Sequence, residues 1–260
     1  VDLHIDYPCT RIGEEYARQH QLPVIRLQHH HAHLAACLAE HLVPLETTPV
    51  LGIILDGLGM GPHDELWGGE ILLGDYRSAK RLGMLKPVAL LGGEKAMREP
   101  WRNTLAQLFS SLGWDHFLEN YGQLKLAKFL KKQPVSTYQS MLQLQRNAPL
   151  ASSAGRLFDA VAAAIGLCQE SVSFEGQAAM QLQGLAEEAY SAEDIDSSSY
   201  PFAILEWKSN RLPYLEPQPM WQALLNDLVD GTPNAVIALR FHRGLAQGLW
   251  QIVQHLQTTR

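Results

Sequence analysis

The first half of this 260-residue chain alternates short apolar runs with segments of helical period, and this rhythm limits the fold more than any other feature. Strands separated by helices are typical of α/β folds, in which helices cover a sheet. Strands are expected at PVIRLQ (23–28), at PVLGIILDG (49–57), the clearest buried strand, and at WGGEILLGDYR (67–77). The last two are expected to be antiparallel, because their connection is short and rich in turn residues.

Helices are predicted where apolar residues recur at helical spacing. The clearest is SSAGRLFDAVAAAIG (152–166), with Ser153 as its N-terminal cap and Gly166 as its stop. In 98–114, Pro100 suits a first helical turn. Further helices are expected at 29–42, 177–190, 219–231 and 235–257, and a surface loop at 191–200. Because the pattern is mostly helical from about residue 115, we expect a first lobe at 1–135 and a second at 136–260.

Composition argues against several classes of protein and partner. With 46% hydrophobic and 18% charged residues, the chain resembles soluble globular proteins, and its apolar runs are too short for a membrane span. The sequence does not open like a secretory signal, which favours the cytoplasm. Cys9, Cys37 and Cys168 lack C-x-x-C spacing and are expected to be ordinary buried thiols in a reducing compartment. A net charge of -6 without basic runs argues against nucleic acid as a partner.

Four histidines lie within five positions in QHHHAHLAACLAEH (28–41). His29 and His33 are four residues apart, so on a helix both imidazoles share one face and can chelate a metal. Asp56, in the turn ILDGLGMG, is the nearest acid placed to add an oxygen ligand. The alternative is a helix cap or a hydrogen-bonded core cluster. A metalloprotease is disfavoured, because His30 stands where H-E-x-x-H requires glutamate.

The turn that contains Asp56 is rich in glycine. Gly57 and Gly59 alternate with larger residues after a strand, which lets backbone N–H groups approach a phosphate closely. The turn lacks G-x-x-x-x-G-K-S/T, so it is no P-loop, and no acid follows at the interval of a dinucleotide-binding site. A phosphate or metal site at this turn is therefore predicted only in combination with other residues.

Two later segments combine a glycine and an acid near the start of a helix. Gly155 would leave one helix start open to a ligand, and Asp159 could accept hydrogen bonds from ribose hydroxyls. Glu175 and Gly176 form a second such turn. Together they are compatible with a nucleotide across a cleft, although a capped amphipathic helix with one acid is the plainer interpretation. The basic residues Lys95, Arg98 and Arg102 form either a phosphate contact or a solvated face.

Seven motifs, in order, resemble the C-terminal transferase region of the nickel-iron hydrogenase maturation carbamoyltransferase family, HypF. They are QHHHAHLAACLAEH, LDGLGMG, WGGEILLGDY, LLGGEKAMREPWR, SSAGRLFDAVAAAIG, FEGQAAM and LRFHRGLAQ, and they extend over nearly the whole chain. That region is similar to the universal tRNA threonylcarbamoyl transferase. The resemblance implies the two-lobed actin/Hsp70/sugar-kinase class with ribonuclease-H-like lobes, incomplete here at both ends.

The resemblance also assigns residues. The family's metal-binding H-x-x-x-H matches His29 and His33, and its first aspartate matches Asp56, for a divalent metal such as iron or zinc. Its nucleotide-contacting G-x-x-x-D matches Gly155 and Asp159, with the turn at Gly176 following. Arg156 departs from the glutamate of the tRNA-modifying relatives, which favours the hydrogenase branch.

The activity implied by the resemblance is carbamoyl transfer. Carbamoyl adenylate, made from carbamoyl phosphate and ATP, would donate its carbamoyl group to the C-terminal cysteine of a maturation partner of the HypE type, supplying the precursor of the cyanide ligands of the hydrogenase. Two alternatives stay open: a small-molecule O-carbamoyltransferase of the same superfamily, and a non-catalytic fragment that binds nucleotide and docks to a partner.

Overall fold

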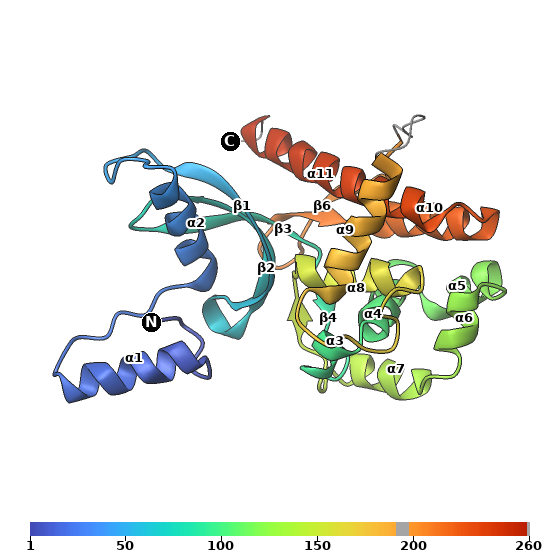
Figure 1. The fold of residues 1–260 in the computed structure, drawn as a ribbon, viewed down its shortest axis with the longest axis horizontal. Coiled ribbons are helices and arrows are strands. Elements are labelled where there is room, and N and C mark those ends of the chain that lie inside the picture. The colour runs from blue at the N-terminus through green and yellow to red at the C-terminus, as the bar shows by residue number, and fades with distance from the viewer. Residues whose placement is uncertain (191–197, 259–260) are drawn as a thin grey trace.

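The computed structural model describes residues 1–190 and 198–258. Its centre is a meander of three antiparallel strands, β1 (Val50–Met60), β2 (Leu66–Gly74) and β3 (Ala79–Leu85) (Figure 1). A single 3-10 turn, η1 (Pro62–Asp64), connects β1 to β2. The β1–β2 register breaks between Leu55, opposite Gly69, and Gly59, opposite Trp67. Such a bulge redirects side chains, and it contains Asp56.

Four short strands extend the sheet. β7 (Pro213–Glu216) is parallel to β3, and β6 (Ala203–Glu206) is antiparallel to β7. At the start of β2, β5 (Leu150–Ala151) pairs in parallel, and β4 (Val88–Ala89) pairs antiparallel to β5. One sheet therefore contains strands from both sides of position 135, and the division into lobes there stays a prediction.

Helices lie on both sides of the meander (Figure 1). On one side are α1 (Pro8–Gln19) and α2 (His29–Glu40). The other side holds α3 (Lys95–Arg98), α4 (Trp101–Ser111), α5 (Trp114–Tyr121), α6 (Lys125–Leu130), α7 (Val135–Gln143), α8 (Ala154–Ala164), α9 (Gln177–Tyr190), α10 (Gln218–Asp230) and α11 (Asn234–Thr258). None of the helices in the described ranges is both long and apolar enough to span a bilayer.

Two apolar clusters fix the parts that matter for the site. The larger joins the helices from α4 to α11, and its fully buried side chains include Phe117, Trp221 and Phe241. The smaller holds α2 against the meander through Leu34 and Leu38, which pack with Trp67 and Leu72. Because α2 uses one face for this packing, its first turn is held over the β1–β2 bulge.

Most predicted elements are confirmed, including the antiparallel β1–β2 pair and the helices at 152–166, 177–190, 219–231 and 235–257. The strand expected at 23–28 is wrong. The segment forms only an isolated parallel bridge, from Asp2 to Leu27, with backbone hydrogen bonds to residues 1–3, and Ile25 is 69% exposed. The loop expected at 191–200 lies mostly outside the described residues.

Two expectations about burial are also corrected. Among residues 1–190 and 198–258, β1 pairs with β2 alone, and its Ile53 and Leu55 are exposed, so it is not the deeply buried strand that its apolar run suggests. Cys9 and Cys37 are exposed, and Cys168 is half-buried, so the thiols are free but not buried. In both cases the apolar character of a segment does not say which neighbours cover it.

Candidate metal and nucleotide site

The first turn of α2 aligns two histidines. Gln28 caps the helix, since its side-chain oxygen accepts a hydrogen bond of 2.7 Å from the backbone N–H of His31. The helix therefore begins at His29, and His33 lies one turn later on the same face. Their Nε2 atoms are 3.1 Å apart, and the rings meet edge to face.

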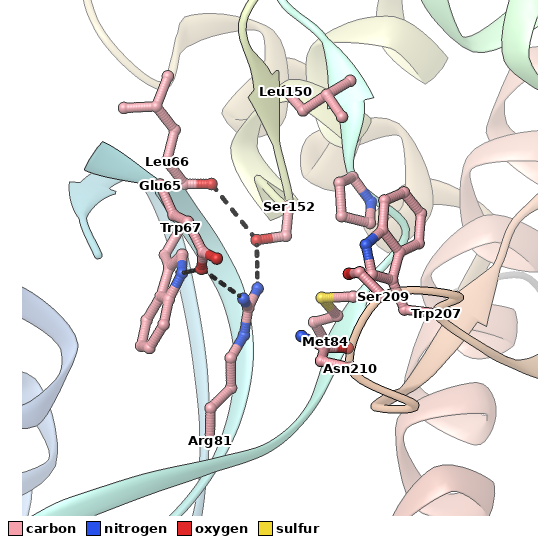
Figure 2. Close-up of a pocket in the computed structure, with 11 residues that line it drawn as sticks. Glu65, Leu66, Trp67, Arg81, Met84, Leu150, Ser152, Trp207, Ser209 and Asn210 are labelled. Atoms are coloured by element: carbon pink, nitrogen blue, oxygen red, sulfur yellow. Dashed lines mark hydrogen bonds and ion pairs between the residues drawn. The ribbon is translucent and has the colours of Figure 1, made fainter. Parts of the chain in front are cut away.

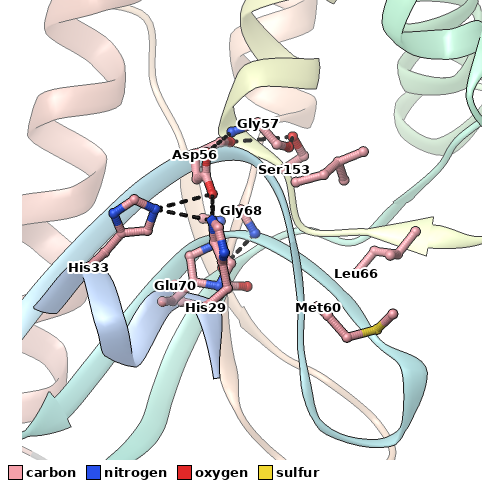
Figure 3. A network of polar contacts seen from close by, with 12 residues as sticks. His29, His33, Asp56, Gly57, Met60, Leu66, Gly68, Glu70 and Ser153 are labelled. Carbon is pink, nitrogen blue, oxygen red and sulfur yellow. Dashed lines mark hydrogen bonds and ion pairs between the residues drawn. The ribbon is translucent and has the colours of Figure 1, made fainter. Parts of the chain in front are cut away.

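Asp56 reaches this pair from the β1–β2 bulge (Figure 3). Its Oδ2 atom lies 3.1 Å from Nε2 of His29 and 3.8 Å from Nε2 of His33. The fully buried His30 lies 3.4 Å from the same oxygen, and the N–H of Gly57 donates to Oδ1 at 2.6 Å. The His30 imidazole, with the Gly57 N–H, lowers the pKa of Asp56 to about 2 despite partial burial, so Asp56 is a carboxylate at neutral pH.

A second carboxylate orients His29 from behind. Oδ2 of Asp2 lies 2.6 Å from Nδ1 of His29. Since a carboxylate only accepts hydrogen bonds, Nδ1 carries the proton, and the lone pair of neutral His29 is on Nε2, toward Asp56. No spacing in the sequence signals Asp2, because it comes to His29 only through the fold.

The three side chains fit a metal ion. Bonds of about 2.0–2.2 Å place neighbouring nitrogen and oxygen ligands about 3–4 Å apart, the range of the distances among His29, His33 and Asp56. Oδ2 of Asp56 is buried without a hydrogen-bond partner, and it faces the His29 lone pair across 3.1 Å. Two acceptors so close repel each other unless a cation lies between them.

His33 is also suited to bind as a neutral imidazole. Partial burial and the neighbouring His29 lower its pKa, so its proton is lost readily. His33 is the most exposed member of the cluster, with 53% of its side chain accessible, which leaves an entry path for a ligand. The fold therefore brings together the three predicted ligands, and metal binding by them stays a prediction.

A cavity of about 730 Å³ opens beside this cluster. Among the predicted nucleotide residues, Gly57, Gly59 and Glu175 line it, together with His29 and Asp56. The same cavity is lined by His4, Asp6, Tyr7, Leu58, Leu66, Leu90, Gly93, Glu94, Met97, Pro149 and Arg156. Its size is within the range of small-molecule sites.

The start of α8 lies directly against the Asp56 turn. Ser153 caps the helix by accepting from the N–H of Arg156 at 3.1 Å, and its hydroxyl donates to the carbonyl of Gly57. A side chain at Gly155 would place its Cβ 2.9 Å from the Cα of Gly57. Gly155 thus allows the helix and the turn to touch, and it does not line the cavity.

Asp159 lies one turn further along α8 and is almost completely buried. Its Oδ2 atom is 2.9 Å from Nε of Arg156. Burial raises the pKa of Asp159 to about 6, and Arg156 opposes this shift. At the start of α9, Gly176 has a φ of +78°, a left-handed conformation that glycine adopts without strain. Neither Asp159 nor Gly176 lines the cavity.

A buried carboxylate that sequence reasoning missed connects the turn to α8. Oε2 of Glu70 accepts from the N–H groups of Gly68 and Gly69, both at 2.6 Å (Figure 3). Its Oε1 accepts from Ser152 at 2.5 Å and from Arg81 at 2.7 Å. The charge of fully buried Glu70 is thus matched by four donors, which hold the start of β2 against the residues that precede α8.

Arg81 reaches Glu70 from β3, along a second and smaller cavity of about 150 Å³. Figure 2 shows its guanidinium between Glu65 and Ser152, beside the ring of Trp67. Both η nitrogens of Arg81 are engaged in these contacts. This cation therefore serves the folded structure.

Of the three basic residues near α3, one is buried and two are exposed. Arg102 is buried, pairs with Glu99 at 2.8 Å and donates to the hydroxyl of Tyr138. Lys95 and Arg98 are exposed. Arg102 thus stabilises the fold, while the other two lie on a solvated face.

Comparison with known proteins identifies the family. The family model "Carbamoyltransferase, Kae1-like Domain, second subdomain" matches residues 52–260, and the model "HypF Kae1-like domain" matches residues 1–40. The chain belongs to the HypF carbamoyltransferase family. This result confirms the resemblance that the ordered motifs indicated.

Individual HypF proteins are similar along most of this chain. Carbamoyltransferase HypF of Rhodobacter capsulatus is 45% identical over 196 residues, 75% of this chain and 25% of that protein. Carbamoyltransferase HypF of Synechocystis is 35% identical over 263 residues, 98% of this chain and 32% of that protein. The chain thus spans about a quarter to a third of the length of these HypF relatives.

Solved HypF structures share the fold. A full-length HypF in a phosphate- and nucleotide-bound form matches with a TM-score of 0.80 and 31% identity, over 99% of this chain and 31% of that one. HypF of T. kodakarensis matches with a TM-score of 0.74 and 28% identity, over 95% and 31% respectively. The predicted α/β fold of the actin/Hsp70/sugar-kinase class is confirmed by these HypF structures.

Proposed function

We propose that this chain contains the site at which a carbamoyl group passes from carbamoyl adenylate to the C-terminal cysteine thiol of a hydrogenase maturation partner of the HypE type. The product would be the precursor of the cyanide ligands of nickel-iron hydrogenase. Family membership supports the reaction class, and a solved relative described as phosphate- and nucleotide-bound supports a nucleotide donor. The free thiols of the chain are compatible with the cytoplasm, where we place the reaction.

One observation carries the proposal. Donor atoms of His29, His33 and Asp56, from two elements of the fold, lie within 4.8 Å of one another, and His29 and Asp56 line a cavity large enough for a nucleotide. Under the proposal these residues hold a divalent metal, iron or zinc, with Asp2 orienting His29. The bound ion would neutralise phosphate charge and help to place the acyl group.

The remaining residues of the cavity would bind the donor. Gly57 and Gly59 lack side chains where the phosphate must approach the backbone, and Glu175 offers a carboxylate to ribose hydroxyls. In the reaction, the partner's thiol loses its proton to solvent, and the thiolate attacks the carbamoyl carbon. The C–S bond forms, the C–O bond to the phosphate breaks, and AMP leaves with the electron pair.

The experiment compares acceptors. The chain is supplied with carbamoyl adenylate and with either a peptide that ends in cysteine or an aminoglycoside, and the products are analysed by mass spectrometry. We expect a carbamoylated thiol on the peptide. Transfer to the sugar hydroxyl alone would replace the proposal with the O-carbamoyltransferase alternative.

Metal binding is measured as well, because product analysis does not identify the docking alternative, which predicts no product with either acceptor. We expect the wild type to bind zinc stoichiometrically and His33→Ala to lose that binding. His41→Ala is the matched control, since His41 lies at the C-terminal end of the same helix and is exposed. Absence of both metal and nucleotide binding in the wild type would favour the docking alternative.

A further inference from the structure

Arg156 is the only lysine or arginine on the wall of the site cavity within residues 1–190 and 198–258. The cavity is otherwise acidic, since the carboxylates of Asp6, Asp56, Glu94 and Glu175 also line it. A phosphate group that entered would be repelled by these charges. Besides any metal ion, a cation fixed in the wall would therefore be required to attract a phosphate group into this cavity.

The local structure holds Arg156 in place. It lies in the first turn of α8, where its backbone N–H is bonded to the Ser153 cap. Gly155 lets this turn touch the backbone of Gly57, which lies beside the carboxylate of Asp56. The guanidinium and the candidate metal ligands thus belong to two segments in direct contact.

Asp159 approaches the guanidinium from the helix side. The contact joins Oδ2 of Asp159 to Nε of Arg156 at 2.9 Å, and neither atom has a well-oriented hydrogen bond. Only 11% of the Arg156 side chain and 5% of the Asp159 side chain are accessible. Because the contact uses Nε, the two η nitrogens are left for a ligand, and a guanidinium binds phosphate through such paired donors.

We infer that Arg156 binds the phosphate group of the nucleotide in this cavity, and that Asp159 is a positioning residue that holds the Arg156 side chain and does not contact the ribose. The inference rests on the proposed function, which supplies the nucleotide. It changes the role that the family motif assigns to Asp159: its carboxylate acts through the guanidinium. It also gives a physical role to Arg156, at the position where the tRNA-modifying relatives carry glutamate.

The test measures binding of two probes, AMP and adenosine, to the 260-residue chain by calorimetry. The probes differ only in the phosphate. For Arg156→Gln we expect AMP to bind about 10- to 100-fold more weakly, since hydrogen bonds to a charged group are lost, with adenosine affinity unchanged. Arg156→Lys should keep part of the AMP affinity as a point charge. Arg98→Gln, on the exposed face of α3, is the control and should change neither affinity.

Asp159→Asn separates the two roles of that residue. If Asp159 positions Arg156, Asp159→Asn should lower the affinity for AMP by a smaller factor than Arg156→Gln does and leave the affinity for adenosine unchanged. In the double variant, Asp159→Asn should cause no further loss of AMP affinity beyond that of Arg156→Gln. If Asp159→Asn lowers the affinities for adenosine and for AMP by the same factor, Asp159 contacts the ribose and the positioning role is overturned. Thermal unfolding of each variant checks that it is folded.

The outcomes also separate this inference from the proposed function. AMP binding that Arg156→Gln and Arg156→Lys both leave unchanged overturns only the phosphate role of Arg156. Absence of AMP binding to the wild type overturns this inference and removes the nucleotide from the proposed function as well.

Discussion

Removing the carboxylate of Asp2 is expected to weaken metal binding without touching any of the three proposed ligands. Asp2 holds Nδ1 of His29 at 2.6 Å, a short charge-assisted hydrogen bond that fixes the ring orientation and its tautomer. The same residue accepts from the N–H of His4 at 2.7 Å through its other oxygen. A carboxylate behind a metal-bound imidazole also raises the basicity of that ligand.

The magnitude follows from the hydrogen bond. A bond to a charged group contributes about 1.5–3 kcal/mol and a neutral one about 0.5–1.5 kcal/mol. Asp2→Asn keeps one neutral acceptor where Asp2 has two, so its single carbonyl oxygen can stay on Nδ1 of His29 only if the N–H of His4 loses its acceptor. The change should therefore cost at least about 1–1.5 kcal/mol of binding free energy, or at least about five- to tenfold in zinc affinity. Asp2→Ala removes the contact and should cost about 10- to 100-fold.

The assay is competition for zinc with a chelator of known affinity, at constant protein concentration. Glu14→Gln is the control, because Glu14 belongs to the same N-terminal segment but pairs with Arg26. Circular dichroism confirms that each variant is folded. If Asp2→Ala binds zinc as tightly as the wild type, with the same stoichiometry, the orienting role of Asp2 is refuted.

Three further predictions concern stability. Glu70→Gln should lower the free energy of unfolding by about 1–3 kcal/mol, because an amide cannot accept from all four donors around this buried group and Arg81 keeps only the exposed Glu65 as a charged partner. The exposed Glu46→Gln should change the free energy of unfolding by less than about 0.5 kcal/mol, and equal effects of the two variants in thermal denaturation would contradict this. Gly155→Ala should destabilise by about 1–3 kcal/mol, since its methyl group would lie 2.9 Å from a backbone carbon. Gly184→Ala, with nothing within 4 Å of its added Cβ, should stabilise α9 by about 0.5–1 kcal/mol. In urea denaturation the two glycine substitutions should therefore change the free energy of unfolding in opposite directions. Burial raises the pKa of Asp159 from 3.8 to about 6, so the folded state holds this proton more tightly than the unfolded chain and stability falls as pH rises from about 4 to 6. Asp159→Asn should remove up to about 3 kcal/mol of this pH dependence of stability, measured by denaturation at several pH values. If the variant keeps the pH profile of the wild type, the pH dependence does not come from Asp159.

Features that depend on neighbours in the chain were predictable from the sequence. The Ser153 cap and the apolar stripe define α8, and the spacing of His29 and His33 places both on one face of α2. These are local properties, because a helix turns every 3.6 residues whatever surrounds it. The ordered motifs identified the family for the same reason, since they need only the residues themselves.

Other features depend on which distant segments meet, and local patterns do not contain that information. Residues 23–28 have the composition of a strand but form only a single bridge, and β1 has the composition of a buried strand but pairs on one side alone within the described residues. Arg102, one of three similar cations, is buried because Glu99 and Tyr138 surround it.

In the candidate site, too, some residues were predictable from the sequence and others only from the tertiary structure. His29 and His33 could be paired from their spacing, Asp56 followed as the nearest acid in a suitable turn, and the family resemblance matched all three. Asp2 is 27 residues from His29, and Glu70 is 82 residues from Ser152, so only the packing of α2, the β1–β2 bulge and α8 brings these partners together. A carboxylate acquires its role from the donors around it, and those donors are set by tertiary contacts.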